Sequence, residues 1–194
     1  MSTLCQQCFL PLKYILLPAW FTNFIAMIIR LAKLSDVAAI MQIIVDIVPA
    51  MRAAGNYQWD DIYPNSAAFE EDIALDQLWV AEFDGEIAGV AAITTDQYPE
   101  YASVGMDINE TAIVVHRLAV GTQYRGKGIA AALMQQAETE ALRRGIKTLR
   151  IDTNTANEAT QKLFPKMGYV FAGEMGLSFR AGLRFYWYEK RLDG

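Results

Sequence analysis

Six consecutive residues at 123–128, Gln-Tyr-Arg-Gly-Lys-Gly, have the composition of a binding site for phosphate. They stand between an apolar run typical of a β-strand, residues 112–120, and a stretch with the periodicity of an amphipathic helix. A turn from a strand into a helix leaves main-chain N–H groups without partners at the positive end of the helix dipole. Gly126 and Gly128 let a ligand approach the main chain closely, and the neighbouring arginine and lysine add positive charge. We call residues 123–128 the glycine loop and expect it to bind a phosphate group.

Two nucleotide-binding patterns compete for the glycine loop. Gly121-x-x-x-x-Gly126-Lys127 follows the P-loop pattern, but the next residue is Gly128 where a serine or threonine would have to hold magnesium. The set 126-x-128-x-x-131 fits the dinucleotide pattern, with Asp152 at a suitable distance for a ribose. In that pattern the glycines follow the strand directly and several βαβ units are needed. In this sequence three polar residues stand between the Gly121 turn after the strand and the glycines of the loop, and one βαβ unit is visible.

A third pattern, Gln-x-x-Gly-x-Gly, fits the glycine loop at every position and resembles the pyrophosphate loop of the GCN5-related N-acetyltransferases. The preceding residues 116–120, His-Arg-Leu-Ala-Val, resemble the central strand of that family. After the loop, an amphipathic helix ends at Gly145, and residues 147–152 read as a strand. Residues 157–169 then resemble the family's second motif, in which an asparagine precedes a helix that ends at Gly-Phe or Gly-Tyr. The resemblance covers roughly residues 27–190.

The other predicted elements are compatible with that family. Residues 28–32 read as a strand, followed by a helix that Ser35 or Asp36 caps and Pro49 ends or kinks, and a second helix begins at Asn65 or Ser66. Two strands, 78–83 and 86–93, flank the Asp84-Gly85 turn. A loop at 94–110 and a strand at 184–190 complete the predicted elements. The order β, α, α, β, β, β, α, β, α, β, β predicts an α+β (mixed α/β) domain. We expect a central, mostly antiparallel sheet with helices on both faces and one βαβ crossover, which is the acyl-CoA N-acyltransferase fold.

Composition limits the partners. The 194 residues suffice for one domain, 27–194, and carry a net charge of −5, which argues against nucleic acid held by bulk electrostatics. The apolar extension 1–26 contains two prolines and Lys13, so a membrane span is not favoured. We prefer a mis-set start codon as its explanation, over an arm that packs on the domain or associates with a membrane. Its Cys5-x-x-Cys8 pair has no second pair, so no metal is expected. We expect a cytoplasmic protein, and leave a homodimer open.

The resemblance implies that acetyl-CoA is the co-substrate. Its pantetheine would lie between two splayed parallel strands, 112–120 and 147–152, and pair with the main chain of Leu118 and Val120. Its pyrophosphate would lie on the amides of residues 125–129. The cofactor-binding residues expected from this are Leu118, Val120, Gln123, Tyr124, Arg125, Gly126, Lys127, Gly128, Ile129, Asn157 and Phe164.

His116, the only histidine, is the first candidate for the catalytic base that takes the proton from the amine. Members that acetylate arylalkylamines resemble this His-x-Leu-Ala-Val arrangement, and an ordinary pKa near 6.5 suits a base at neutral pH. The acid limb of activity is then expected near pH 6 to 7. A purely structural His116 is the alternative, and Glu110, the second catalytic candidate, or Asp107 could act through water. Phe164 stands where many members carry a tyrosine that protonates the departing thiolate.

The acceptor is expected to be a primary amine of a small molecule or peptide, which attacks acetyl-CoA directly in a ternary complex. Trp59, Tyr63, Pro64 and Phe69 fall where the family builds its acceptor wall, although core packing would also explain them. A non-catalytic acetyl-CoA-binding regulatory module is the first alternative function, and the missing tyrosine at 164 is its best support. A nucleotide- or dinucleotide-binding protein that uses the glycine loop is the second.

Overall fold

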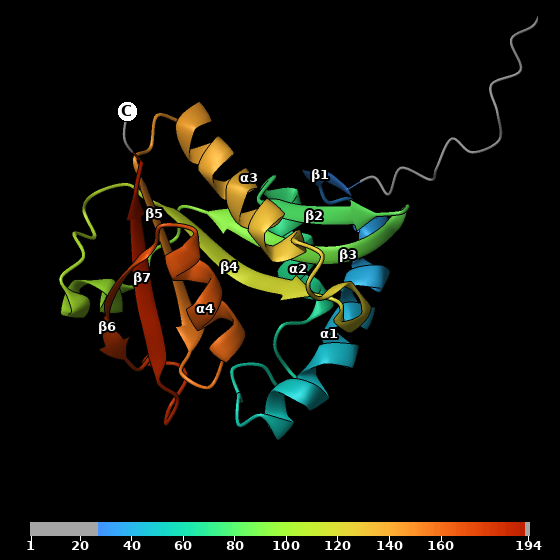
Figure 1. Ribbon diagram of the computed structural model, residues 1–194, viewed down its shortest axis with the longest axis horizontal. Helices are drawn as coiled ribbons and strands as arrows, with labels where there is room; N and C mark the ends of the chain where they lie inside the picture. Colours follow the sequence, from blue (N-terminus) through green and yellow to red (C-terminus); the bar gives the residue numbers. More distant parts are fainter. Residues whose placement is uncertain (1–26, 193–194) are drawn as a thin grey trace, which may run out of the picture.

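The structure, a computed structural model, describes residues 27–192 and consists of one seven-stranded sheet with helices on both faces (Figure 1). The strands lie in the order β1-β2-β3-β4-β5-β7-β6. In chain order the elements are β1 (Met27–Leu31), α1 (Val37–Ala53), α2 (Ser66–Ala74), β2 (Leu78–Phe83), β3 (Glu86–Thr94), β4 (Ile113–Val120), α3 (Ile129–Arg143), β5 (Thr148–Asn154), α4 (Glu158–Lys166), β6 (Val170–Met175) and β7 (Phe185–Arg191). This confirms the predicted order and fold class. The predicted extension 1–26 lies outside the described residues.

All neighbouring strands pair in antiparallel fashion except β4 and β5, which are parallel and are joined by the α3 crossover. The β2–β3 hairpin turns at Asp84 and Gly85, with φ values of 54° and 81°. Positive φ at both positions is the geometry that an Asp-Gly pair favours. The hairpin prediction is therefore confirmed.

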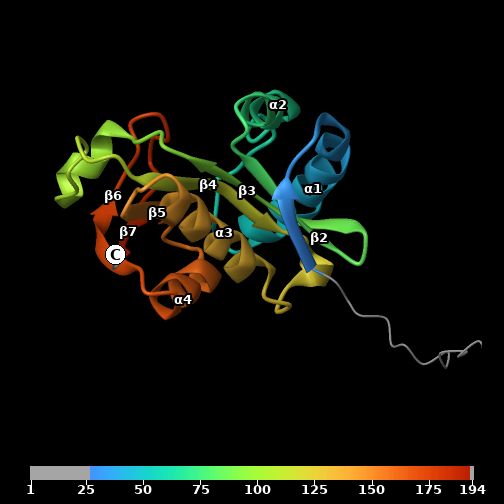
Figure 2. The same cartoon turned by 90° about the horizontal axis from the view of Figure 1, so that it is seen from above.

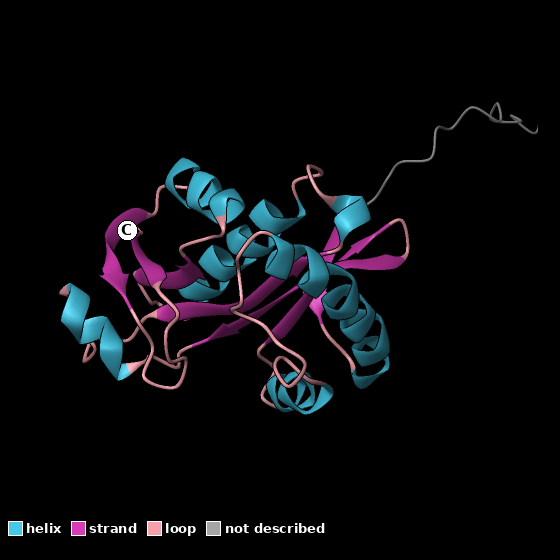
Figure 3. Ribbon diagram, turned by 90° about the horizontal axis from the view of Figure 1, so that it is seen from below, coloured by secondary structure: helices cyan, strands magenta, loops and turns pink. Residues whose placement is uncertain are grey.

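The two faces of the sheet are covered by different helices, and Figure 2 shows α1 and α2 on one side with α3 and α4 on the other. Ile129, Leu133 and Ala137 of α3 pack with Phe164 of α4 in the largest core. On the opposite face, a second core joins α1 and α2 to the strands β2–β4, and a third gathers around Trp187 of β7. Seen from below, the strands form one layer between these helices (Figure 3).

Several local predictions were wrong. The segment predicted as a loop at 94–110 contains a 3₁₀ helix, Pro99–Val104, whose Tyr101 is fully buried against Trp187 at 4.4 Å between ring centroids. This tertiary contact, rather than any local periodicity, orders the segment. Pro49 does not end α1, which continues to Ala53. The carbonyl that loses its hydrogen bond belongs to Val45, an exposed residue, so water can satisfy it.

The start of α1 also differs from the prediction. A 3₁₀ turn, Leu34–Asp36, precedes the helix, and Asp36 occupies the N-cap position without capping the helix amides. Its carboxylate accepts hydrogen bonds from the Arg30 guanidinium at 2.7 Å and from the Lys33 amide at 2.8 Å. The predicted strand 78–83 agrees with β2, and the limits of the other strands predicted with a range differ from the observed ones by at most two residues.

Candidate active site

The sheet opens between β4 and β5. These strands pair at three positions, ending with Val115 opposite Ile151, and no pairing follows in the described chain. The next residues in register are His116 and Asp152, and beyond them the strands diverge (Figure 1). A cavity of about 960 Å³ occupies this opening, lined by β4, β5, the start of α3, α4 and the segment between α1 and α2. The splayed strands that the sequence predicted are therefore present.

The glycine loop forms one end of the cavity. Gly126 and Gly128 have φ values of 75° and 81°, and a Cβ added to either would meet nothing within 4 Å. Gly128 is the N-cap of α3, and no side chain caps this helix. In the described chain neither glycine amide donates to a main-chain carbonyl outside the helix. Open space, free amides and a helix N-terminus fit the pyrophosphate of a nucleotide-bearing thioester.

The side chains of the loop play different parts. Tyr124 is buried, and its hydroxyl donates a hydrogen bond to Glu86. The ammonium group of Lys127 lies 4.7 Å from the centre of the Phe83 ring. Lys127 and Gln123 do not line the cavity, whereas the remaining predicted cofactor-binding residues do: Leu118, Val120, Tyr124, Arg125, Gly126, Gly128, Ile129, Asn157 and Phe164.

A β-bulge shapes the middle of β4. The register with β3 shifts between Val90 and Ala92, and Arg117 opposite has a φ of 53°. A non-glycine residue in this conformation costs on the order of 1 kcal/mol, and such strain is common at functional sites. The Arg117 guanidinium is fixed by Asp72, at 2.7 Å and 2.5 Å, and by the Tyr63 hydroxyl at 2.9 Å. These hydrogen bonds tie the bulge of β4 to α2 through Asp72 and to the segment before α2 through Tyr63.

His116 lies half-buried on the cavity wall. Its Nε2 is 3.1 Å from the main-chain oxygen of Asp96, so Nε2 carries the proton and donates it, and Nδ1 is left as an acceptor. Burial lowers the pKa of His116 to about 4, although the bond to Asp96 acts in the opposite direction. The sequence-based expectation of a value near 6 to 7 is therefore corrected, because it ignored the lost hydration of the imidazolium.

Asp152, which the sequence suggested only as a ribose ligand in a nucleotide-binding reading, also lines the cavity. Burial raises the pKa of its carboxyl to about 7, with only a main-chain hydrogen bond opposing the rise. The residue directly follows the last β4–β5 pair, as His116 does on β4, and this relation depends on a register that the sequence does not reveal.

The end of the cavity opposite the glycine loop is aromatic. Trp59 and Tyr63 of the predicted acceptor wall line it, whereas Phe69 is a core residue and Pro64 lines a separate hollow. Sequence reasoning missed the other wall residues. Phe185 begins β7, and the rest come from the segment 94–110 and the β6–β7 connection: Tyr98, Leu177, Phe179 and Arg180. No periodicity marks these loops, so the sequence held no signal for them.

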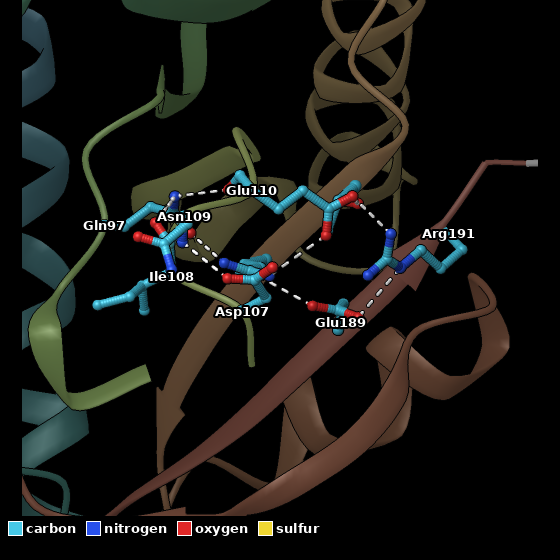
Figure 4. Close-up of polar contacts among 9 residues, drawn as sticks. Gln97, Asp107, Ile108, Asn109, Glu110, Glu189 and Arg191 are labelled. Carbon is cyan, nitrogen blue, oxygen red and sulfur yellow. Dashed lines mark hydrogen bonds and ion pairs between the residues drawn. The ribbon is translucent and has the colours of Figure 1, made fainter. Parts of the chain in front are cut away.

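The structure places Glu110 away from His116. Its carboxylate accepts hydrogen bonds from Arg191 at 2.5 Å and Thr148 at 2.8 Å (Figure 4). Burial alone would raise its pKa, but these hydrogen bonds outweigh burial and lower it. Glu110 does not line the cavity. The structure therefore does not bring the two predicted catalytic residues together.

Asn157 and Phe164 belong to α4. Asn157 is the N-cap and accepts a hydrogen bond from the Thr160 amide at 3.5 Å. Phe164 packs against Tyr188 and Tyr169, and the Tyr169 hydroxyl is buried without a partner in the described chain. Tyr169 does not line the cavity, so α4 presents an apolar ring and no phenol there.

Two further observations concern metals and membranes. Residues 27–192 contain no group of three or more histidine, cysteine, aspartate or glutamate side chains able to hold a metal ion. The stretch Leu34–Ala53 is long and apolar enough to cross a membrane by length and composition. However, Ile40, Ile44 and Ile47 of this stretch pack into the core against the sheet.

Comparisons with known proteins agree with this architecture. The sequence pattern of the acetyltransferase (GNAT) family matches residues 39–169. The uncharacterized N-acetyltransferase YesJ of Bacillus subtilis is 27% identical over 149 residues, which cover 73% of this chain and 81% of that protein. A GNAT-family acetyltransferase of Streptococcus agalactiae has a similar structure, with a TM-score of 0.70 and 28% identity over 87% of this chain and 96% of that one. The structure of yncA from Salmonella typhimurium, with its cofactor acetyl-CoA, has a TM-score of 0.63 and 20% identity over 87% and 95%.

Proposed function

Because this chain belongs to the acetyltransferase (GNAT) family, we propose that it transfers an acetyl group from acetyl-CoA to a primary amine of a small molecule or peptide, by direct attack in a ternary complex. The observation that carries this proposal is the single cavity that begins at the uncapped N-terminus of α3 and passes between the splayed strands β4 and β5. The similarly folded yncA holds acetyl-CoA.

The main chain supplies most of the binding groups. Of the amides of residues 125–129, those of Gly126 and Gly128, at the positive end of α3, would hold the pyrophosphate, since the amides of 125 and 127 donate to main-chain carbonyls. The edge of β4 that faces β5 has no strand partner after Val115, so Leu118 and Val120 can pair with an extended, amide-bearing ligand. The bound thioester would supply an activated acetyl group with a good leaving group.

The chain's own residues would then handle the proton and the developing charge. We assign to Nδ1 of His116 the acceptance of one proton from the amine, because Nε2 is occupied with Asp96. A main-chain N–H near Leu118 would stabilise the oxygen as it becomes negative. Phe164 has no proton to give, but a thiol with an ordinary pKa of about 8.5 leaves readily as the thiolate.

The alternative remains a non-catalytic acetyl-CoA-binding regulatory module. The apolar ring of Phe164, in place of a phenol at the cavity, is the observation that favours it. In that case acetyl-CoA would bind and no amine would be acetylated.

Replacing Gly128 by valine tests the binding site. The valine would have to adopt the φ of 81° that Gly128 has, which a β-branched residue disfavours. Its side chain would also fill the space that we assign to the phosphate oxygens. We expect acetyl-CoA to raise the Tm of the wild type, by the equivalent of about 2.7 kcal/mol at a hundredfold excess over Kd. Gly128→Val should lose this shift.

Gly145→Val is the matched control. Gly145 lies just past the other end of α3, has a φ of 68°, and also has nothing within 4 Å of an added Cβ. Both variants carry similar backbone strain, so only Gly128→Val should lose acetyl-CoA binding. An unchanged acetyl-CoA shift in Gly128→Val would exclude the glycine loop as the pyrophosphate site.

A further inference from the structure

One carboxylate in the cavity is not used by the proposed chemistry. Asp152 is half-buried at the point where β4 and β5 part. In the described chain no side chain forms a hydrogen bond or ion pair with it. An ionised carboxylate removed from water costs several kcal/mol unless a cation or donor accompanies it.

The cations around Asp152 are already engaged. Arg117 is bound to Asp72, and Arg180 is bound to Asp60 at 3.1 Å. Arg150, two residues earlier on the same strand, is bound to Glu189 at 3.0 Å. None of these arginines is paired with Asp152 in the described chain, so a cation that enters the cavity can pair with it.

The surroundings define what kind of cation fits. Tyr98 packs on the His116 ring at 5.3 Å and on the Phe179 ring at 5.2 Å, so an aromatic wall stands over this end of the cavity. An organic ammonium with an apolar body matches a buried carboxylate beside such a wall, whereas a hydrated inorganic cation does not.

We propose that Asp152 binds the ammonium group of the acceptor, and that the acceptor is a primary amine with an apolar or aromatic group close to its nitrogen. This inference rests on the proposed acetyl transfer and names its substrate class. Asp152 also places the nitrogen beside His116, the next residue across the parting strands.

The proton balance is consistent with Asp152 as the ammonium-binding group and His116 as the base. The acceptor enters as R–NH₃⁺, and one proton passes from nitrogen to Nδ1 of His116. The electron pair left on nitrogen attacks the thioester carbon, and the C–S bond breaks with its electrons going to sulfur. Asp152 stays ionised and accepts hydrogen bonds from the remaining N–H groups. The second nitrogen proton leaves after the C–N bond has formed, and neutralises the thiolate.

The pH dependence of amine binding follows from burial of Asp152. Because its pKa is raised to about 7, the carboxyl takes up a proton as the pH falls through 7 and no longer attracts a cation. Amine affinity should therefore weaken below pH 7. The titratable or charged groups that face this region from the neighbouring elements are His116, Arg117, Tyr63, Tyr98, Tyr101, Arg150 and Arg180. Burial raises the pKa of Tyr98 and Tyr101, so both stay neutral between pH 5.5 and 8.5, and His116, with a pKa of about 4, stays neutral there as well.

The test measures binding to the full chain by calorimetry, with 2-phenylethylamine as the probe and 2-phenylethanol as its uncharged analogue. At pH 8 the wild type should prefer the amine, and Asp152→Asn should bind it about tenfold or more weakly, with the alcohol unaffected. The amine affinity of the wild type should fall between pH 8 and pH 5.5, and that of Asp152→Asn should not. Asp76→Asn, the same change at an exposed residue whose φ of 53° an asparagine tolerates, should behave as the wild type.

The outcomes separate this inference from the proposed function. If Asp152→Asn keeps the preference for the amine, or if the wild type has none, Asp152 is not the ammonium site, whether or not acetyl-CoA binds. If acetyl-CoA fails to bind the wild type while the amine preference depends on Asp152, the ammonium site stands and acetyl transfer does not. Unchanged acetyl-CoA binding by Asp152→Asn would show that this variant is folded. If it does not fold, Asp152→Glu replaces it in the test; this variant keeps the charge and should keep the amine preference.

Discussion

At the point where β4 and β5 part, two side chains respond to the same loss of water in opposite directions. Burial disfavours the charged form of each group, so it lowers the pKa of His116 and raises that of Asp152. At neutral pH the imidazole is therefore neutral and can accept a proton, and the carboxyl is close to its titration midpoint. Protonation of either group at acid pH would reduce activity, but at different pH values.

Substitution of His116 by glutamine tests its role as the base. The glutamine amide can still donate to the Asp96 carbonyl but accepts no proton near neutrality, so we expect kcat/KM to fall about 10²-fold. Because the pKa of His116 is lowered to about 4, its own acid limb should lie well below 6. A break near pH 7 belongs to Asp152 and should survive in His116→Gln.

Steady-state rates with acetyl-CoA and an amine, measured from pH 4.5 to 8.5 by thiol release, distinguish the possibilities. Acetyl-CoA affinity serves as the control and should barely change. A wild-type rate in His116→Gln would remove the residue from the chemistry. Loss of acetyl-CoA affinity together with the rate would make it structural.

At this scale the sequence allowed part of the site to be predicted. The glycine loop and the pair Leu118 and Val120 depend on local main-chain geometry, which motifs record. Glu110 was a reasonable candidate by proximity in sequence, but only the fold reveals its partners Arg191 and Thr148. The importance of Asp152 depends on the register of β4 against β5 and on burial, and neither property is written in a local pattern.

At the scale of elements, a polar cluster outside the cavity lining ties β5 to β7. Arg150 of β5 is fully buried and binds Glu189 of β7 at 3.0 Å and the side chain of Gln97. Arg191, which also binds Glu189 and Glu110, is 55% exposed (Figure 4). The two arginines therefore share partners but differ in burial.

Alanine substitutions should separate the effects of burial. Arg150→Ala leaves an empty space and deprives Glu189 of its buried partner, so the free energy of unfolding should fall by about 3 kcal/mol or more. Arg191→Ala removes a solvent-screened pair and should cost less than about 1 kcal/mol. Urea denaturation at pH 7 measures both. Equal decreases in the free energy of unfolding would show that burial of Arg150 does not increase its contribution to stability.

Secondary structure was predictable where local chemistry decides it. The Asp84-Gly85 turn and the order of helices and strands follow from turn residues and periodicity. The 3₁₀ helix Pro99–Val104 was missed because it is held by Tyr101 in a core built from β4, β7 and the β6–β7 connection. Pro49 does not end α1 for a related reason, since packing of α1 on the sheet outweighs one lost hydrogen bond.

At the scale of the molecule, residues 27–192 form a seven-stranded sheet with helices and hydrophobic cores on both faces. We predict that a chain beginning at Met27 folds, binds acetyl-CoA as the full chain does, and is more soluble, since the first 26 residues are strongly apolar. Its Tm should lie within a few degrees of the full-length value. Calorimetric melting and sedimentation of both chains provide the measurement, and an insoluble or unfolded product would show that the first 26 residues contribute to the fold.

The parting of β4 and β5 also affects how the protein moves. A continuous sheet distributes fluctuations over many hydrogen bonds, but here three residue pairs join the half-sheet β1–β4 to the half-sheet β5–β7. These two bodies are therefore expected to open and close against each other more readily than either deforms internally. A ligand that forms hydrogen bonds to both β4 and β5 would restrict this opening motion. Protection from amide hydrogen exchange on ligand binding should accordingly spread across both half-sheets, far beyond the residues that touch the ligand.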